Sequence, residues 1–105
     1  MIYFGGSLSA KIPDTDLARF TLASATELDE KPALIDGPTG RALSYRALER
    51  GVRSFAAGLA SRGFRKGDTL AIYMPNVPEY AVAFYGTVAA GGRCTTVNPL
   101  YTVRE

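Results

Sequence analysis

The sequence predicts an α/β fold in which a β-hairpin, an amphipathic helix and a parallel βαβ unit follow one another. Residues 69–74 form a short apolar run, typical of a strand buried on both faces. A second run, rich in β-branched residues, covers 93–97. The segment between them, about 79–90, is long enough for a helix and is followed by two glycines. Two short strands joined by one helix indicate a right-handed βαβ unit with parallel strands.

The N-terminal part predicts an arm and a first helix. Residues 1–13 are polar and contain glycine, so we expect an extended arm that packs on another surface. Asp14 or Thr15 is the expected cap of a helix. The apolar face of that helix consists of Leu17, Phe20, Leu22 and Ala23. Residues 29–32 end in proline and break the helix.

A hairpin is expected over residues 33–43. Its two short apolar strands flank residues 36–40, which are rich in turn formers. A loop of this length is common between antiparallel strands.

A long helix is expected over residues 44–62, with Ser44 as its N-cap. Its apolar side chains recur at helical spacing and form one face: Leu48, Val52, Phe55, Ala56 and Leu59. Glu49 and Arg53 form a favourable i,i+4 pair on the charged side. Gly63 is the expected left-handed stop.

The βαβ unit is expected over residues 67–98. Pro75 ends the first strand, and Pro78 suits the first turn of the following helix, where a missing N–H costs nothing. Apolar residues occupy nearly all sides of that helix: Tyr80, Val82, Ala83, Phe84, Tyr85 and Val88. A helix of this kind is usually buried in a large protein.

The last four residues, 102–105, match Thr-x-x-Glu, a capping box that opens a helix. The pattern is common enough to arise by chance. Here it follows a predicted strand and an Asn98-Pro99 turn. We therefore expect that the chain is the N-terminal part of a larger, incomplete domain.

Size and charge restrict the class of protein. The 105 residues form one domain at most. Twelve basic and ten acidic residues give a net charge of +2 without a basic cluster, so no nucleic-acid partner is expected. No apolar run approaches the roughly 20 residues that span a bilayer, and the N-terminus does not have the pattern of a signal peptide. We expect a cytoplasmic protein.

The sequence contains one cysteine, Cys94, and no histidine. An internal disulfide is therefore excluded, as are Ser–His and Cys–His catalytic pairs. Cys94 lies in an apolar strand, which favours a buried and unreactive thiol.

No catalytic, cofactor-binding or metal-binding residue is assigned from the sequence. GxGxxG and GxxxxGK[ST] do not occur, and the glycines at 86, 91 and 92 lie at the wrong end of a helix for phosphate binding. A nucleotide-binding Rossmann-like protein is therefore disfavoured.

Two acidic pairs, Asp14 with Asp16 and Asp29 with Glu30, lie near turns and a helix N-terminus. Carboxylates at such positions stabilise the helix dipole, and we favour that structural role over acid–base catalysis.

Asn76 and Asn98 each follow the carboxyl end of a predicted parallel strand. Ligands of open α/β sheets bind at such ends, so both loops are candidates to border a cleft. We favour the alternative that they only end the strands and begin the next elements.

Four segments, in this order and spacing, carry a family pattern: Lys31-Pro-Ala-Leu-Ile-Asp-Gly, Leu43-Ser-Tyr-Arg-Ala-Leu, Gly63-Phe-Arg-Lys-Gly-Asp, and a stretch from Met74-Pro-Asn to Thr95-Thr-Val-Asn-Pro-Leu-Tyr-Thr. Together they resemble the N-terminal region of acyl-CoA synthetases of the adenylate-forming superfamily. The resemblance is closest to 4-coumarate–CoA ligases and related acyl-CoA ligases. It covers residues 12–105 and implies that the fold is the N-terminal portion of that superfamily's large domain, over residues 1–105.

The resemblance implies a ligase that activates a small-molecule carboxylic acid with Mg-ATP and transfers the acyl group to CoA. ATP, Mg and CoA are thus implied for the full-length family member, in fatty-acid or phenylpropanoid metabolism. The family's Ser/Thr/Gly-rich phosphate loop and its C-terminal lysine do not occur in residues 1–105. The matching residues, at 43–48 and 89–98, resemble scaffold, and Arg93-Cys94 departs from the small apolar residues of related enzymes.

We therefore expect an N-terminal segment of an AMP-forming acid–CoA ligase that binds no cofactor and is inactive by itself. The alternative is a non-catalytic interaction module that pairs with another chain through open sheet edges. In either case, exposed apolar surface predicts self-association.

Overall fold

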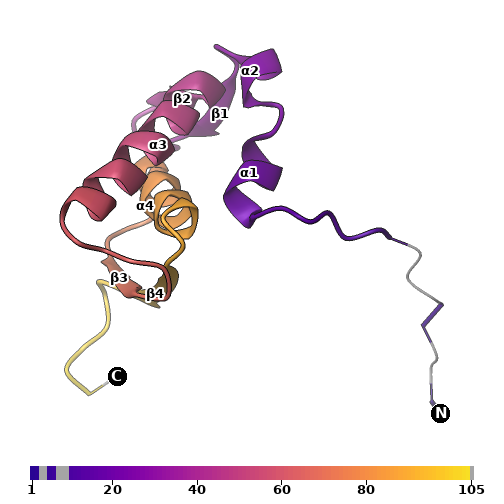
Figure 1. Ribbon diagram of the computed structural model, residues 1–105. Coiled ribbons are helices and arrows are strands. Elements are labelled where there is room, and N and C mark those ends of the chain that lie inside the picture. The colour runs from indigo at the N-terminus through magenta and orange to yellow at the C-terminus, as the bar shows by residue number, and fades with distance from the viewer. Residues whose placement is uncertain (3–4, 7–9, 105) are drawn as a thin grey trace.

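The structure is a computed structural model that describes residues 1–2, 5–6 and 10–104 (Figure 1). Within these residues the elements follow the order α1 (Leu17–Leu22), α2 (Ala25–Leu28), β1 (Pro32–Ile35), β2 (Ala42–Ser44), α3 (Tyr45–Ser61), β3 (Thr69–Tyr73), α4 (Pro78–Ala89) and β4 (Arg93–Val97). The order of hairpin, amphipathic helix and parallel βαβ unit is confirmed. The expected arm over 1–13 includes residues 3–4 and 7–9, and the expected capping box includes Glu105; both therefore lie partly outside the described residues.

The cap of α1 is Asp16, so the prediction of Asp14 or Thr15 is wrong. The Arg19 backbone N–H donates to Asp16 Oδ1 at 2.8 Å, and the Arg19 guanidinium lies 3.2 Å from Oδ2. Three polar residues in succession offer three possible caps, and the sequence pattern alone does not choose between them.

The predicted apolar face of α1 is also wrong. Leu17 and Phe20 are 50% and 59% exposed, whereas the buried residues of α1 and α2 are Ala18 and Ala25. Small side chains allow α1 to pack on α4 and α2 to pack on α3. The sequence 17–28 also forms two short helices, because the chain turns at Ala23 and Ser24.

The hairpin of β1 and β2 is antiparallel, with Ile35 opposite Ala42. The Gly40 N–H donates to the Asp36 carbonyl at 2.7 Å, and Gly40 has a φ of 70°, which a residue with a Cβ rarely adopts. The Thr39 hydroxyl donates to the Asp36 carboxylate and completes the turn.

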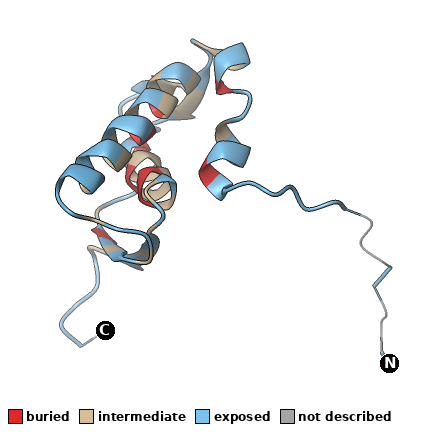
Figure 2. Ribbon diagram, viewed as in Figure 1, coloured by how far each residue is buried: buried red, intermediate tan, exposed pale blue. Residues whose placement is uncertain are grey.

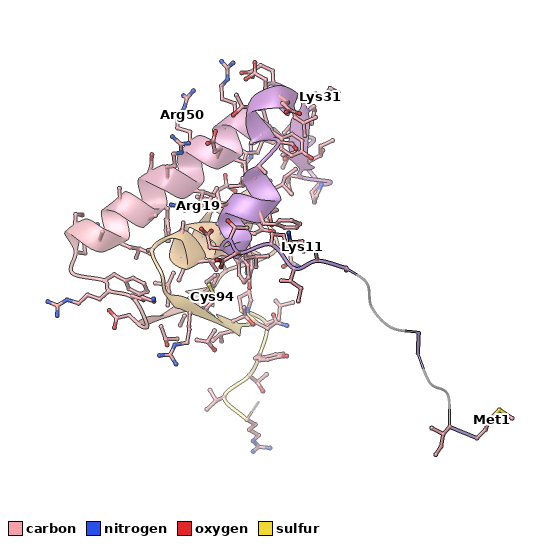
Figure 3. All side chains as sticks on the ribbon, turned by 45° about the vertical axis from the view of Figure 1, so that its right-hand side comes forward. Met1, Lys11, Arg19, Lys31, Arg50 and Cys94 are labelled. Carbon is pink, nitrogen blue, oxygen red and sulfur yellow. The ribbon has the colours of Figure 1, made fainter. Side chains whose placement is uncertain are left out.

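Helix α3 begins and ends as its sequence predicts. The Ser44 hydroxyl accepts from the Ala47 N–H at 3.2 Å, and Gly63 follows the helix with a φ of 87°. Arg53 donates to Glu49 at 2.6 Å on the exposed side. Figure 3 shows Arg50 on the outer side of α3.

The core lies between α3 and α4, which form the most extensive contact between two elements (Figure 2). Glycines allow the two helices to approach closely. A Cβ at Gly86 would lie 2.7 Å from a ring atom of Phe55, and one at Gly51 would lie 3.1 Å from Val82. Thr87 is completely buried, and its hydroxyl donates to the Ala83 carbonyl at 2.7 Å.

Strands β3 and β4 are parallel, in register from Thr69 opposite Arg93 to Tyr73 opposite Val97. Helix α4 connects them and packs on one face, with Pro78 in its first turn as predicted.

The prediction that the first of these strands is buried on both faces is wrong. Ile72 is 3% exposed, but Tyr73 is 65% exposed, and Thr69 and Ala71 are exposed as well. The sheet has two strands, and α4 covers only one of its faces. A short apolar run therefore alternates in burial, because nothing in the described part of the chain covers its second face.

None of the helices described is both long and apolar enough to cross a membrane.

Candidate functional site

Two hollows meet at the start of α4, and Asn76 contributes to both. The first has a volume of about 500 Å³ and lies between the β1–β2 loop and α4. The second has a volume of about 400 Å³ and lies where the loops after β3 and β4 meet. We call them the hairpin hollow, lined by Ile35, Asp36, Pro38, Asn76, Tyr80 and Phe84 among others, and the strand-end hollow, lined by Met74, Asn76, Tyr80, Val97, Asn98 and Leu100 among others.

Both Asn loops border the strand-end hollow, and the preference for a purely structural role of these loops stays a prediction. Parallel strands bring their carboxyl ends to one edge of the sheet, so the loops that begin at Asn76 and Asn98 border the same hollow. The Asn98 side chain also holds its own turn, because its Oδ1 accepts from the Leu100 N–H at 3.0 Å.

The described residues that line the two hollows are mostly apolar or uncharged. The strand-end hollow is lined by apolar residues, Asn76, Thr96, Asn98 and Tyr80, without a carboxylate or a cationic side chain. The one carboxylate of the hairpin hollow, Asp36, accepts the Thr39 hydroxyl. Among the described residues, neither hollow is lined by a cationic side chain that could neutralise phosphate charge.

An ion pair ties the hairpin to the first turn of α4. The Arg41 guanidinium donates two hydrogen bonds to the Glu79 carboxylate, at 2.5 Å and 2.8 Å. These bonds, together with the backbone N–H of Glu79 itself, lower the pKa of Glu79 to about 2. The pKa of Arg41 is raised by the same hydrogen bond. The pair is 38 residues apart in sequence, and no local pattern indicates it.

Three of the four acidic residues singled out in the sequence make contacts that stabilise local structure. Asp16 caps α1. Asp29 and Glu30 both pair with Arg46 at the start of α3, with Glu30 at 3.4 Å. Among the residues that the structure describes, no group of three or more His, Cys, Asp or Glu side chains could hold a metal ion.

Cys94 is half-buried rather than fully buried. Figure 3 shows it within the sheet, and its Sγ–H donates to the Phe84 carbonyl of α4 at 3.6 Å. The thiol thus packs against the connecting helix and is not among the residues that line either hollow.

The glycine-rich turn after α4 joins two loops. Gly91 has a φ of 79°, and its carbonyl accepts from the Gly67 N–H at 2.9 Å. The Arg93 guanidinium donates to the Gly67 carbonyl, at 3.1 Å from Nε and 2.5 Å from Nη2. These groups close the start of the β3–β4 pair, at the end opposite the strand-end hollow.

The comparison with known families decides the identity of this fold. The sequence profile of the AMP-binding enzyme family matches residues 22–105, which is most of the chain. The chain belongs to this family.

Individual relatives agree with the family. The chain is 37% identical over 102 residues to 4-coumarate–CoA ligase 3 of Oryza sativa, a match that covers 91% of the chain and 18% of the rice protein. It is 42% identical over 83 residues to the long-chain-fatty-acid–CoA ligase of Salmonella typhimurium, which covers 78% of the chain and 14% of that ligase. The chain thus spans less than a fifth of the length of these curated relatives.

Solved structures share the fold. The acetoacetyl-CoA synthetase from Streptomyces lividans aligns with a TM-score of 0.78 at 32% identity, over 85% of this chain and 14% of that protein. A nonribosomal peptide synthetase solved with α-methyl-L-serine-AMP aligns with a TM-score of 0.81 at 26% identity, over 90% of this chain and 10% of that protein. The fold of this chain therefore recurs within larger solved proteins.

Proposed function

We propose that this AMP-binding chain belongs to an AMP-forming acid–CoA ligase and forms scaffold of its large domain. In the first step of such a reaction, a carboxylate attacks the α-phosphate of Mg-ATP, forms an acyl-adenylate and releases pyrophosphate. In the second step, the thiol of CoA attacks the acyl carbon, and AMP leaves. The match over residues 22–105, with relatives named as acid–CoA ligases, carries this proposal.

The site geometry supports a scaffold role for these residues. Adenylate formation requires cations at the phosphates and groups that hold adenosine. Among the described residues, the polar side chains that line the two hollows are two amides, two tyrosines, one threonine and one hydrogen-bonded carboxylate. We therefore propose that ATP, Mg and CoA bind to groups outside these 105 residues, and that the chain alone is inactive.

Calorimetry tests the scaffold part of the proposal. We expect no measurable heat when Mg-ATP is titrated into the purified 105-residue chain, and no AMP when CoA and 4-coumarate are added. Micromolar binding of ATP would contradict the scaffold role, because it would place the nucleotide site within these residues.

Sequencing of the gene beyond the codon for Glu105 tests the ligase part. We expect an open frame that leads to a Ser/Thr/Gly-rich loop with a lysine. A stop codon directly after Glu105 would contradict the assignment of ligase activity to this gene product.

A further inference from the structure

Basic side chains gather at the amino end of the β3–β4 sheet. Four exposed cations come from two segments of the chain: Arg62, Arg65 and Lys66 between α3 and β3, and Arg93 at the start of β4. The Gly67 N–H donates to the Gly91 carbonyl at 2.9 Å, and a Cβ at Gly91 would lie 3.3 Å from the Lys66 side chain. The two segments therefore lie side by side, and we call residues 62–68 and 91–93 the basic patch.

The basic patch holds the excess positive charge of the chain. It contains four of the 12 basic residues and one of the 10 acidic residues, Asp68, so its net charge is +3. The remaining eight basic and nine acidic residues give the rest of the chain a net charge of −1. The sequence shows no basic run, because 26 residues separate Gly67 from Arg93 and only the fold brings the two segments together.

Structural roles account for only part of this charge. Cations near the C-terminal ends of helices stabilise the helix dipole, and α3 and α4 both end beside the patch. Arg93 is held by the Gly67 carbonyl. The side chains of Arg62, Arg65 and Lys66 take part in none of the hydrogen bonds or ion pairs of the described residues. Three cations are therefore free to meet an external anion.

The carboxylates around the patch already have partners. Asp68 Oδ2 accepts from the Arg65 backbone N–H at 2.7 Å. A hollow at the end of α4 contains Asp16 and Glu49, and each of these forms an ion pair with an arginine one turn further along its own segment. The positive charge of the patch therefore faces solvent.

Small side chains form the surface beside the cations. The exposed residues at the end of α3 lack bulk: Ala57, Gly58, Ala60, Ser61 and Gly63. The one aromatic ring of the patch, Phe64, is half-buried and packs inward, since a Cβ at Gly92 would collide with it. A broad anionic surface can thus approach the cations, whereas the patch presents no exposed ring that could stack on a nucleic-acid base.

We propose that the basic patch docks the chain on an anionic phospholipid surface. Each Lys or Arg near such a surface strengthens binding about fivefold, so the three free cations together contribute on the order of 100-fold. The binding is electrostatic and reversible, because the ring of Phe64 points inward and does not insert into the bilayer. The strand-end hollow lies at the opposite end of the sheet and stays open when the patch is docked.

Vesicle sedimentation with the purified 105-residue chain tests the proposal. We expect binding to phosphatidylcholine vesicles that contain about 30% phosphatidylserine, and much weaker binding to phosphatidylcholine alone. Raising the NaCl concentration from roughly 50 mM to roughly 500 mM should weaken binding at least about tenfold, because salt screens exposed charges. Equal binding to neutral and anionic vesicles would overturn the proposal, because exposed apolar residues would then cause the adsorption.

The double variant Arg65→Gln with Lys66→Gln should lower the partition coefficient on anionic vesicles about 30-fold. Glutamine keeps the Cβ and Cγ with which Lys66 contacts Gly91. The matched control is Lys31→Gln with Arg50→Gln, which removes the same charge from exposed residues that Figure 3 shows far from the β3–β4 sheet. We expect the control to lose at most about twofold. Equal losses in the two double variants would overturn the proposal, because binding would then follow net charge.

Soluble polyglutamate distinguishes a lipid surface from an acidic protein. We expect polyglutamate to displace the chain from anionic vesicles no better than NaCl of the same ionic strength. A chain that bound polyglutamate through Arg65 and Lys66 but ignored anionic vesicles would overturn the proposal, because the occupant would then be an acidic polypeptide. The lipid and salt dependence of the unmodified chain tests the patch even if a variant does not fold, and none of these measurements depends on catalysis.

Discussion

At the residue scale, Gly86 sets how closely α3 and α4 approach. A Cβ at this position would lie 2.7 Å from the Phe55 ring and 2.9 Å from the Phe55 Cβ, which is fixed to the backbone of α3. We expect Gly86→Ala to separate the helices and to lower the free energy of unfolding by about 1–3 kcal/mol, measured by urea denaturation.

Gly58→Ala is the matched control for this prediction. Gly58 lies on the exposed side of α3, and a Cβ there would have no neighbour within 4 Å. The substitution should stabilise the helix by up to about 1 kcal/mol, because alanine restricts the unfolded chain. Equal effects of the two substitutions would contradict the packing role of Gly86.

The lowered pKa of Glu79 leads us to expect that the stability of the chain depends on pH. Its pKa is about 2 in the folded chain against 4.5 for a free glutamate, so the folded state holds the ionised form. The stabilisation is complete above pH 4.5 and is lost as the pH falls toward 2. Glu79→Gln should flatten the curve of unfolding free energy in this range, measured by chemical denaturation at successive pH values.

Arg41→Gln checks the cause of that shift. Arg41 provides the largest contribution, and the backbone N–H of Glu79 provides the next. The variant should therefore remove most, but not all, of the slope between pH 2 and 4.5. An unchanged slope would show that the ion pair does not lower the pKa of Glu79 in solution.

At the scale of elements, α3 is the part of the fold that its own sequence defines best. Ser44 accepts from the Ala47 N–H, so Ser44→Ala should remove this cap and lower the free energy of unfolding by about 1 kcal/mol. Ser54→Ala, on the exposed side of the same helix, should be neutral or slightly stabilising, because alanine is the better helix former. Urea denaturation of both variants measures the difference, and an equal loss in both would contradict the capping role.

Helix α3 could be predicted because its signals are local: apolar spacing, a serine cap and a terminal glycine. Helix α1 could not be predicted as well, because three polar residues compete for its cap and its contact uses Ala18. The sequence favours large apolar residues as the core face, but close packing of α1 on α4 requires a small one.

At the scale of the whole molecule, stability should be greatest where α3 crosses α4. Native-state hydrogen exchange measures it: we expect the slowest amides in these two helices and the fastest in residues 10–13 and 98–104. The short helices α1 and α2 should exchange at intermediate rates, because the main contact of α1 is with α4 and that of α2 is with α3. Amides of α1 that exchange as slowly as those of α3 would contradict this order.

The candidate site, too, could be predicted only in part from the sequence, because some of its features depend on contacts between distant residues. The loops after β3 and β4 were recognisable as possible cleft borders from Asn76 and Asn98 alone. Their meeting in one hollow required the parallel register of the strands. The Arg41–Glu79 pair left no sequence signal, because its residues meet only when the hairpin packs against α4.

The sequence by itself determined the order of elements, the bounds of α3, the parallel βαβ unit and the family resemblance, because each depends on local spacing or on a pattern of neighbouring residues. The tertiary structure decided which faces are covered. The residues of β3 are the same whether a second layer lies on them or not, and burial of a face depends on the element that packs against it. The exposure of Ala71, Tyr73 and Val97 is therefore a property of the folded chain and not of the local sequence.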